Sequence, residues 1–363
     1  MCYSSVLKMR FLFFFCLLIT TTSQASVQGD SIAIIKSNYE QVYSKLSKGL
    51  ESGKIIFRDA VFMVENAYYD NHLDTVGLRN AIEFIASECN YFIKTNKLNY
   101  EKKDKKDVEK WASIFTVMTK TSLINTDSAI IYSKPFTYDF DDFWGEKNWE
   151  NMFVSKLLGL GSGNCHSMPY LYKMIAEELG TTAHLALAPN HIYIKHRSQQ
   201  DGWYNTELTS AAFPVDAWIM VSGYVHLNAI ENQIYMKSLG DRESIALCLV
   251  DLAEGYKRRT SNNDLAFVLK CCETALKYFP NYINALLLKA ETLKQLYDSE
   301  VNKSPKPDNQ SKVKLSNQFQ EMQGLYVRIH QLGYRQMPKE MYLKWLMELR
   351  TEKEKYQNKK VER

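Results

Sequence analysis

The spacing of apolar residues changes twice along the chain and divides it into three regions. From residue 26 to 130 apolar side chains recur about every 3.6 residues, which predicts helices. Three later runs alternate apolar and polar side chains and predict short strands: Ala183–Ala188, His191–His196 and Trp203–Thr209. Beyond Pro214 the helical spacing returns. We therefore predict an α+β fold in which helical regions flank a small antiparallel sheet.

These patterns also set the expected boundaries. We predict a helical N-terminal region, a mixed core and two groups of C-terminal helices, the last with a charged tail: residues 26–130, 131–220, 240–300 and 310–363. The core opens with aspartates among aromatic residues, but their spacing lacks the pattern of a calcium-binding loop. A structured aromatic loop is therefore expected there, followed by a short helix from Trp149 to Leu158.

The first 25 residues are typical of a signal peptide. Lys8 and Arg10 precede the apolar run Phe11–Ile19, and a small-residue cleavage motif ends at Ala25. The run is shorter than the roughly 20 residues that span a bilayer, so an uncleaved anchor is the weaker alternative. Met9 is an alternative start that leaves the same pattern. We expect a secreted or periplasmic protein with no membrane span after cleavage.

Composition limits the classes of partner that the chain could bind and the roles that its cysteines could have. The 363 residues are 45% apolar and 24% charged, as in globular proteins, and a net charge of +4 without a basic stripe argues against nucleic acid. Five cysteines follow the leader, too few for a disulfide scaffold, and the odd number leaves a free thiol. Cys165 is our candidate. The adjacent Cys271 and Cys272 are expected to lie one in the core and one on the surface, not as a redox pair.

Cys165 stands at a predicted helix start. The glycines Gly159, Gly161 and Gly163 precede it and allow sharp turns. No strand clearly precedes them, so they are not a dinucleotide-binding fingerprint. The helical pattern runs from His166 to a stop at Gly180, and a proline at position 169 is tolerated only near its beginning. A thiol at a helix N-terminus loses its proton more easily, so Cys165 is a candidate nucleophile.

A histidine and an acid on the strands complete a candidate site. A five-residue hairpin loop that pairs His196 with Gly202 places His191 opposite Glu207, whereas a one-residue slip places them on opposite faces. Asn205, on the same face as Glu207, is the alternative third group. Two further asparagines, Asn164 and Asn190, are expected to support the site or an oxyanion. His166 directly follows the cysteine, so its side chain diverges and serves packing or substrate contact.

Other interpretations of these residues are weaker. Cys165, His184 and His191 could bind zinc, but no closely spaced ligand pairs occur and a fourth ligand is missing. Cys165 alone could also be a buried structural thiol, and His191 a hydrogen-bonded strand residue. We predict no metal and no cofactor.

Three segments resemble the transglutaminase-like superfamily, whose fold is papain-like. They are the helix start Gly163–Ser167, the strand Pro189–Ile194, with Asn190 in place of glycine, and Trp203–Glu207. The resemblance covers about residues 140–215. Residues Ser244–Tyr297 also resemble about one and a half tetratricopeptide repeats, which accompany a bacterial branch of that superfamily.

The resemblance implies a thiol enzyme that acts on amide bonds. Cys165 is then the nucleophile, His191 the general base and acid, and Glu207 the residue that orients the imidazole. Peptidases, amidases, acyl transferases and inactive members all belong to the superfamily. We favour hydrolysis of a protein or peptide substrate, because water is abundant outside the cell and no acyl-acceptor site is visible. The alternative is a non-catalytic scaffold that binds a protein partner through its repeat-like helices.

Overall fold

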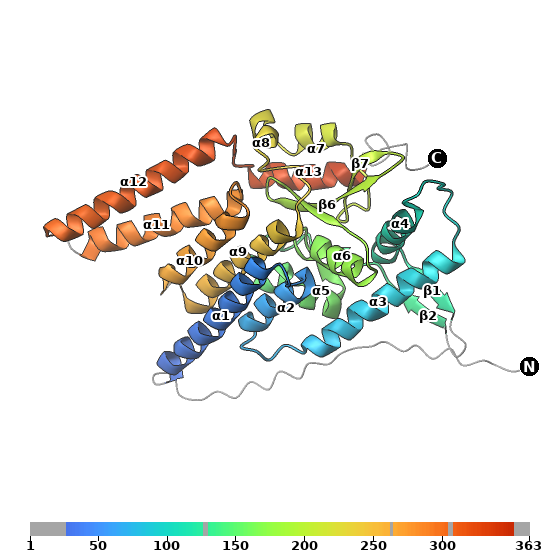
Figure 1. The fold of residues 1–363 in the computed structure, drawn as a ribbon, viewed down its shortest axis with the longest axis horizontal. Coiled ribbons are helices and arrows are strands. Elements are labelled where there is room, and N and C mark those ends of the chain that lie inside the picture. Colours follow the sequence, from blue (N-terminus) through green and yellow to red (C-terminus); the bar gives the residue numbers. More distant parts are fainter. Residues whose placement is uncertain (1–26, 126–129, 262–263, 304–307, 352–363) are drawn as a thin grey trace, which may run out of the picture.

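The computed structural model describes residues 27–125, 130–261, 264–303 and 308–351 (Figure 1). The predicted signal peptide and most of the charged tail lie outside these ranges. The described residues form a mixed helix and sheet protein, compatible with the predicted α+β class, with a helical N-terminal region. None of the described helices is both long enough and apolar enough to cross a membrane.

The N-terminal region is helical except at its end. Four helices follow one another: α1 (Val27–Ser52), α2 (Phe57–Tyr68), α3 (Thr75–Thr95) and α4 (Lys105–Thr119). The prediction of helix as far as residue 130 is wrong for the last part, where β1 (Ser122–Asn125) pairs with β2 (Ile130–Ser133). A helix satisfies its backbone N–H and C=O groups within one segment, whereas these two strands satisfy theirs by pairing with each other, which the apolar spacing of one segment does not reveal.

The central sheet lies between two sets of helices. It consists of β5 (His184–Ala188), β6 (His191–Ser198) and β7 (Gly202–Thr206), which are antiparallel and lie in that order. The other elements of this part of the chain are β3 (Thr137–Tyr138), η1 (Trp149–Met152), α5 (Val154–Leu160), β4 (Ser162–Gly163), α6 (Ser167–Glu178), α7 (Asp216–Ser222) and α8 (Leu227–Glu231). On one face His196 stacks on Trp111 of α4, with ring centroids 4.5 Å apart. The other face carries His191, which is covered by helices from later in the chain.

The hairpin register differs from the predicted one by two residues. Ser198, not His196, pairs with Gly202, so the loop has three residues. The Ser198 hydroxyl accepts the Asp201 amide at 2.9 Å and tightens the turn. Continued beyond β7, this register places Glu207 beside Tyr193 rather than directly opposite His191. Because side chains alternate between faces, a shift of two keeps Glu207 on the face of His191, as its diagonal neighbour.

Two carboxylates fix the helices near Cys165, of which Glu65 is buried and Glu177 is half-buried. Both Glu65 oxygens accept amides at the start of α5, from Val154 at 2.7 Å and Ser155 at 2.9 Å. Glu177, on α6, does the same for α2, accepting the amides of Phe57 and Arg58 at 3.2 Å each. Each carboxylate occupies hydrogen-bond donors that a helix start leaves free. The ends of α2, α5 and α6 are therefore tied to one another.

The C-terminal part is helical, as predicted. It contains α9 (Asp241–Thr260), α10 (Leu265–Tyr278), α11 (Ile283–Lys303), α12 (Asn309–Gln331) and α13 (Lys339–Thr351). The prediction that Cys271 and Cys272 divide between core and surface is wrong, because both are fully buried. Helix α10 packs against α9, α11 and α1, so positions 271 and 272, about 100° apart around the helix, are both covered.

Helix α12 runs back from the far end of the C-terminal helices, and α13 then lies beside the sheet (Figure 1). Gly333 adopts a left-handed φ of 85° at the end of α12, where a Cβ would meet the Ala229 amide nitrogen at 2.7 Å. Trp345 of α13 then stacks on Trp218 of α7, with centroids 5.8 Å apart. The last described helix therefore lies over the face of the sheet that carries His191.

Candidate active site

Cys165 lies in the turn between α5 and α6, two residues before the first residue of α6. The buried Asn164 shapes this turn: its side-chain oxygen accepts the amides of His166 at 2.9 Å and Ser167 at 3.2 Å, and its side-chain nitrogen donates to the Phe143 carbonyl at 3.0 Å. These bonds satisfy donors at the start of α6. Asn164 therefore supports the site by positioning Cys165, with its side-chain groups already engaged.

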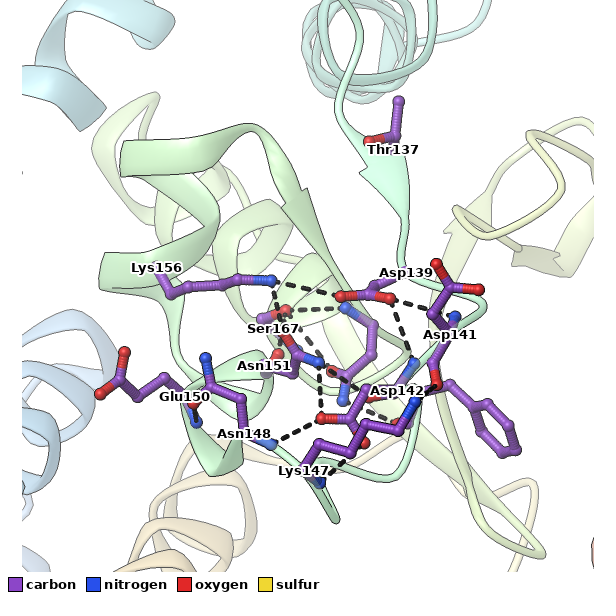
Figure 2. Close-up of polar contacts among 12 residues, drawn as sticks. Thr137, Asp139, Asp141, Asp142, Lys147, Asn148, Glu150, Asn151, Lys156 and Ser167 are labelled. Atoms are coloured by element: carbon purple, nitrogen blue, oxygen red, sulfur yellow. Dashed lines mark hydrogen bonds and ion pairs between the residues drawn. The ribbon is translucent and has the colours of Figure 1, made fainter. Parts of the chain in front are cut away.

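The loop before α5 is tied to the same turn (Figure 2). Asp142 accepts the amides of Lys147 at 3.1 Å and Asn148 at 2.7 Å, and its own carbonyl accepts the Asn151 side chain at 2.8 Å. The Ser167 hydroxyl donates to the Asn151 carbonyl at 3.1 Å. The aspartates of this segment thus bind backbone amides, as expected of a structured loop, and the loop braces the first turn of α6.

His191 and Glu207 are in direct contact. The Nε2 atom of His191 lies 2.6 Å from a Glu207 carboxylate oxygen, and both residues are buried. The other Glu207 oxygen accepts the amide and hydroxyl of Thr209, at 2.8 and 2.6 Å. Asn205, the alternative third group, donates instead to Pro214 and Asp216. The acid that reaches the histidine is therefore Glu207.

A tyrosine from α13 connects the histidine to the thiol. The Tyr342 hydroxyl lies 3.1 Å from Cys165 Sγ, to which it donates, and 3.1 Å from His191 Nδ1. A phenol has one proton, so the Nδ1 contact requires Nδ1–H to donate to the Tyr342 oxygen. With Nε2–H donating to Glu207, the ring carries both protons. The ring is then an imidazolium beside a carboxylate, and the sulfur accepts a hydrogen bond, as a thiolate does.

The pKa shifts agree with that charge state. Burial opposes ionisation of Cys165, but the hydrogen bond and charge of His191 outweigh it and lower the pKa of the thiol. Burial also favours a neutral His191, yet the charge of Glu207 and the bond to Cys165 raise the pKa of the imidazole to about 10. The pKa of Glu207 is lowered, because the His191 charge offsets the cost of burial. Opposite charges at short distance account for all three directions.

The remaining predicted residues lie near the site but make other contacts. Asn190 forms the turn into β6 with a left-handed φ of 57°, which asparagine tolerates, and its carbonyl lies 3.7 Å from Cys165 Sγ. His166 contacts Asp251 of α9 at 3.0 Å and packs against the tilted ring of Tyr170, so it serves packing. His184 contacts the Leu239 carbonyl at 3.0 Å. Within the described ranges, no three His, Cys, Asp or Glu side chains form a group that could hold a metal ion.

Sequence reasoning missed Tyr342 and its neighbour Trp345. Tyr342 is separated from Cys165 by 177 residues, and it is fully buried. Positions 342 and 345 lie on one side of the predicted last helix, a spacing that indicates a buried face. That spacing does not say which surface the face covers.

Comparisons with protein families, with curated proteins and with solved structures find no match to this chain. The assignment of chemistry therefore depends on the geometry of the site.

We expect Gly163→Ala to destabilise the turn that holds Cys165. A Cβ at this position would lie 2.3 Å from the Ser167 hydroxyl, which is held by Asn151 and cannot easily move. Overpacking of this kind costs about 1–3 kcal/mol of unfolding free energy, measurable by urea denaturation. Gly159→Ala is the matched control, since no atom lies within 4 Å of a Cβ there. Equal stability of the two variants would contradict a tightly packed turn.

We also expect Glu207→Gln to lower the pKa of His191. Loss of the carboxylate charge removes the main stabiliser of the imidazolium, so the pKa should fall by about one unit or more from its value near 10. Histidine 15N NMR at about pH 9 measures the proton directly. The wild-type ring should be doubly protonated and the variant partly neutral. Asp216→Asn, which changes an acid bonded to Lys195 and Asn205, is the control. An unchanged His191 titration in Glu207→Gln would contradict the assignment.

Proposed function

We propose that this chain is a thiol enzyme that cleaves or transfers acyl groups at amide bonds of a protein or peptide, through Cys165, His191 and Glu207. The observation that carries the proposal is the 2.6 Å contact of His191 with Glu207, together with the shared hydroxyl that links the histidine to Cys165. The resemblance of the three site segments to the transglutaminase-like superfamily, and to a papain-like core, supports the same function.

The first half-reaction forms a thioester. The thiolate of Cys165 attacks the amide carbonyl carbon, and a carbon–sulfur bond forms while the carbonyl oxygen takes the negative charge. His191 then donates its Nδ1 proton to the amine nitrogen as the carbon–nitrogen bond breaks. Glu207 holds the ring orientation through Nε2 during this transfer.

The oxyanion needs a donor near the thiol. Asn164, His166 and Ser167 already use their amides for bonds within the turn. We assign the role to the main-chain amide of Cys165, which stands at the start of α6, where the helix dipole also favours negative charge.

The second half-reaction releases the acyl group. Water, or an amine, gives its proton to the Nδ1 of His191 and attacks the thioester, and the thiolate leaves. Water yields a peptidase or amidase and an amine yields an acyl transferase. We favour hydrolysis, since the leader-like N-terminal sequence suggests an exported protein in a water-rich compartment.

Burial of the thiol favours a second candidate function. Cys165 is only 8% exposed, and a substrate cannot reach it in the arrangement described above. A non-catalytic scaffold, binding a protein through its C-terminal helices, is compatible with that closure. The pKa directions of the buried network favour the enzyme, because an inert buried cysteine has a raised pKa, as Cys248 does.

A substrate panel tests the proposed function. Wild-type protein, Cys165→Ala and Cys248→Ala are incubated with peptide, isopeptide and cell-wall amide substrates, with and without an added amine. We expect slow release of amine from at least one class by wild type and by Cys248→Ala, since substrate enters only when the closed site opens transiently, and none by Cys165→Ala. Turnover that survives in Cys165→Ala would contradict the assignment of the nucleophile.

A further inference from the structure

The reactive groups are covered by one helix. Tyr342 and Trp345 of α13 are 0% and 2% exposed, and the Trp345 indole meets the His191 ring edge-on, with centroids 4.7 Å apart. Tyr342 packs against Phe143 and Trp144, with centroids 5.4 and 5.0 Å away. A substrate that reaches Cys165 must therefore displace these side chains.

The Tyr342 hydroxyl occupies the place of a reacting group. It lies 3.1 Å from both Sγ and Nδ1, the two atoms between which a scissile amide must sit to be attacked and protonated. Tyr138 adds a third contact, 3.4 Å from the same hydroxyl. The hydroxyl stabilises the thiolate and blocks it at the same time.

The attachment of α13 permits its release. Its outer face is solvated, and at its start the ion pair of Lys339 with Glu146, at 2.9 Å, joins side chains that are 48% and 67% exposed. Exposed pairs of this kind are weak. The connector from α12 contains Gly333, with its left-handed φ, and Pro338. By contrast α12 ends against α8, where the Leu332 carbonyl accepts Asn232 at 3.5 Å. A movement of α13 about this connector can leave α12 in place.

We propose that α13 is an internal inhibitor, with Tyr342 and Trp345 filling the substrate site until the helix moves away. The inference rests on the proposed function. It also names a substrate feature: once α13 has left, Phe143, Trp144 and Trp218 line the vacated space. These rings favour a peptide that carries an aromatic side chain near the amide that is attacked.

The test measures alkylation of Cys165 by iodoacetamide in the full chain. Cys248, fully buried in α9, is followed in the same digest and reports unfolding of the whole protein. Trp345→Ala keeps the Tyr342 hydroxyl and removes the largest contact of α13, so Cys165 labelling should accelerate about tenfold or more while Cys248 stays protected. Lys344→Ala, an exposed position of the same helix, is the matched control and should label like wild type.

A second pair of variants leaves the aromatic contacts intact. Lys339→Glu replaces an attraction with a repulsion and should speed Cys165 labelling by a few-fold, and adding Glu146→Lys should restore the wild-type rate. A synthetic peptide of residues 337–351, added to Trp345→Ala, should slow Cys165 labelling again. The same peptide with alanine at positions 342 and 345 should not.

Three results overturn the inference. The first is that Cys165 labels at the same rate in wild type, Trp345→Ala and Lys339→Glu. The second is that Cys165 labels only at the rate at which Cys248 does. The third is that the two peptides slow labelling equally. Failure of the proposed function gives a different result, in which Trp345→Ala exposes Cys165 but the thiol reacts no faster than glutathione at the same pH.

Discussion

The contact between His191 and Glu207 is the constraint on which the rest of the site depends. Both groups are buried, and a buried charge is costly unless it is paired and its remaining hydrogen-bonding capacity is used. Thr209 occupies the second Glu207 oxygen, and Tyr342 occupies the second nitrogen of His191. The imidazolium then stabilises the Cys165 thiolate. The charge on each member of the network is therefore stabilised by the opposite charge on its neighbour.

The scaffold holds these groups on separate rigid elements. Cys165 is placed by the start of α6, which is braced by Asn164 and by the loop that carries Asp142. His191 is the first residue of β6 and follows a turn in which Asn190 adopts a left-handed φ. Precise placement of this kind is what catalysis by proximity requires. The carboxylates of Glu65 and Glu177 extend the bracing to α2 and α5.

Much of the site could be predicted because its signals are local. The helix after Cys165 follows from apolar spacing and from Pro169 near its start. The strand that carries His191 and the strand that ends just before Glu207 follow from alternation. The hairpin register could not be predicted, because the Ser198 hydroxyl stabilises a loop two residues shorter than expected. Glu207 still lies on the same face of the sheet as His191, because side chains alternate with a period of two residues.

Non-local packing accounts for the rest. The short strands β1 and β2 form through pairing with each other, and Cys272 is buried because α10 has neighbours on several sides. Tyr342 reaches Cys165 across 177 residues of sequence. The spacing of apolar residues identifies which face of a helix is buried, but not which other element that face packs against. The residues that close the site therefore emerged only from the structure.

A titration of the Cys165 thiol in the full chain tests the thiolate–imidazolium pair most directly. Thiolate formation is followed by ultraviolet absorbance, with Cys165→Ser protein subtracted, so that α13 need not open for the measurement. Because the imidazolium stabilises the thiolate, we expect Cys165 to ionise well below the ordinary thiol pKa of about 8.5. A midpoint at or above that value would contradict the thiolate–imidazolium pair and, with it, the proposed chemistry.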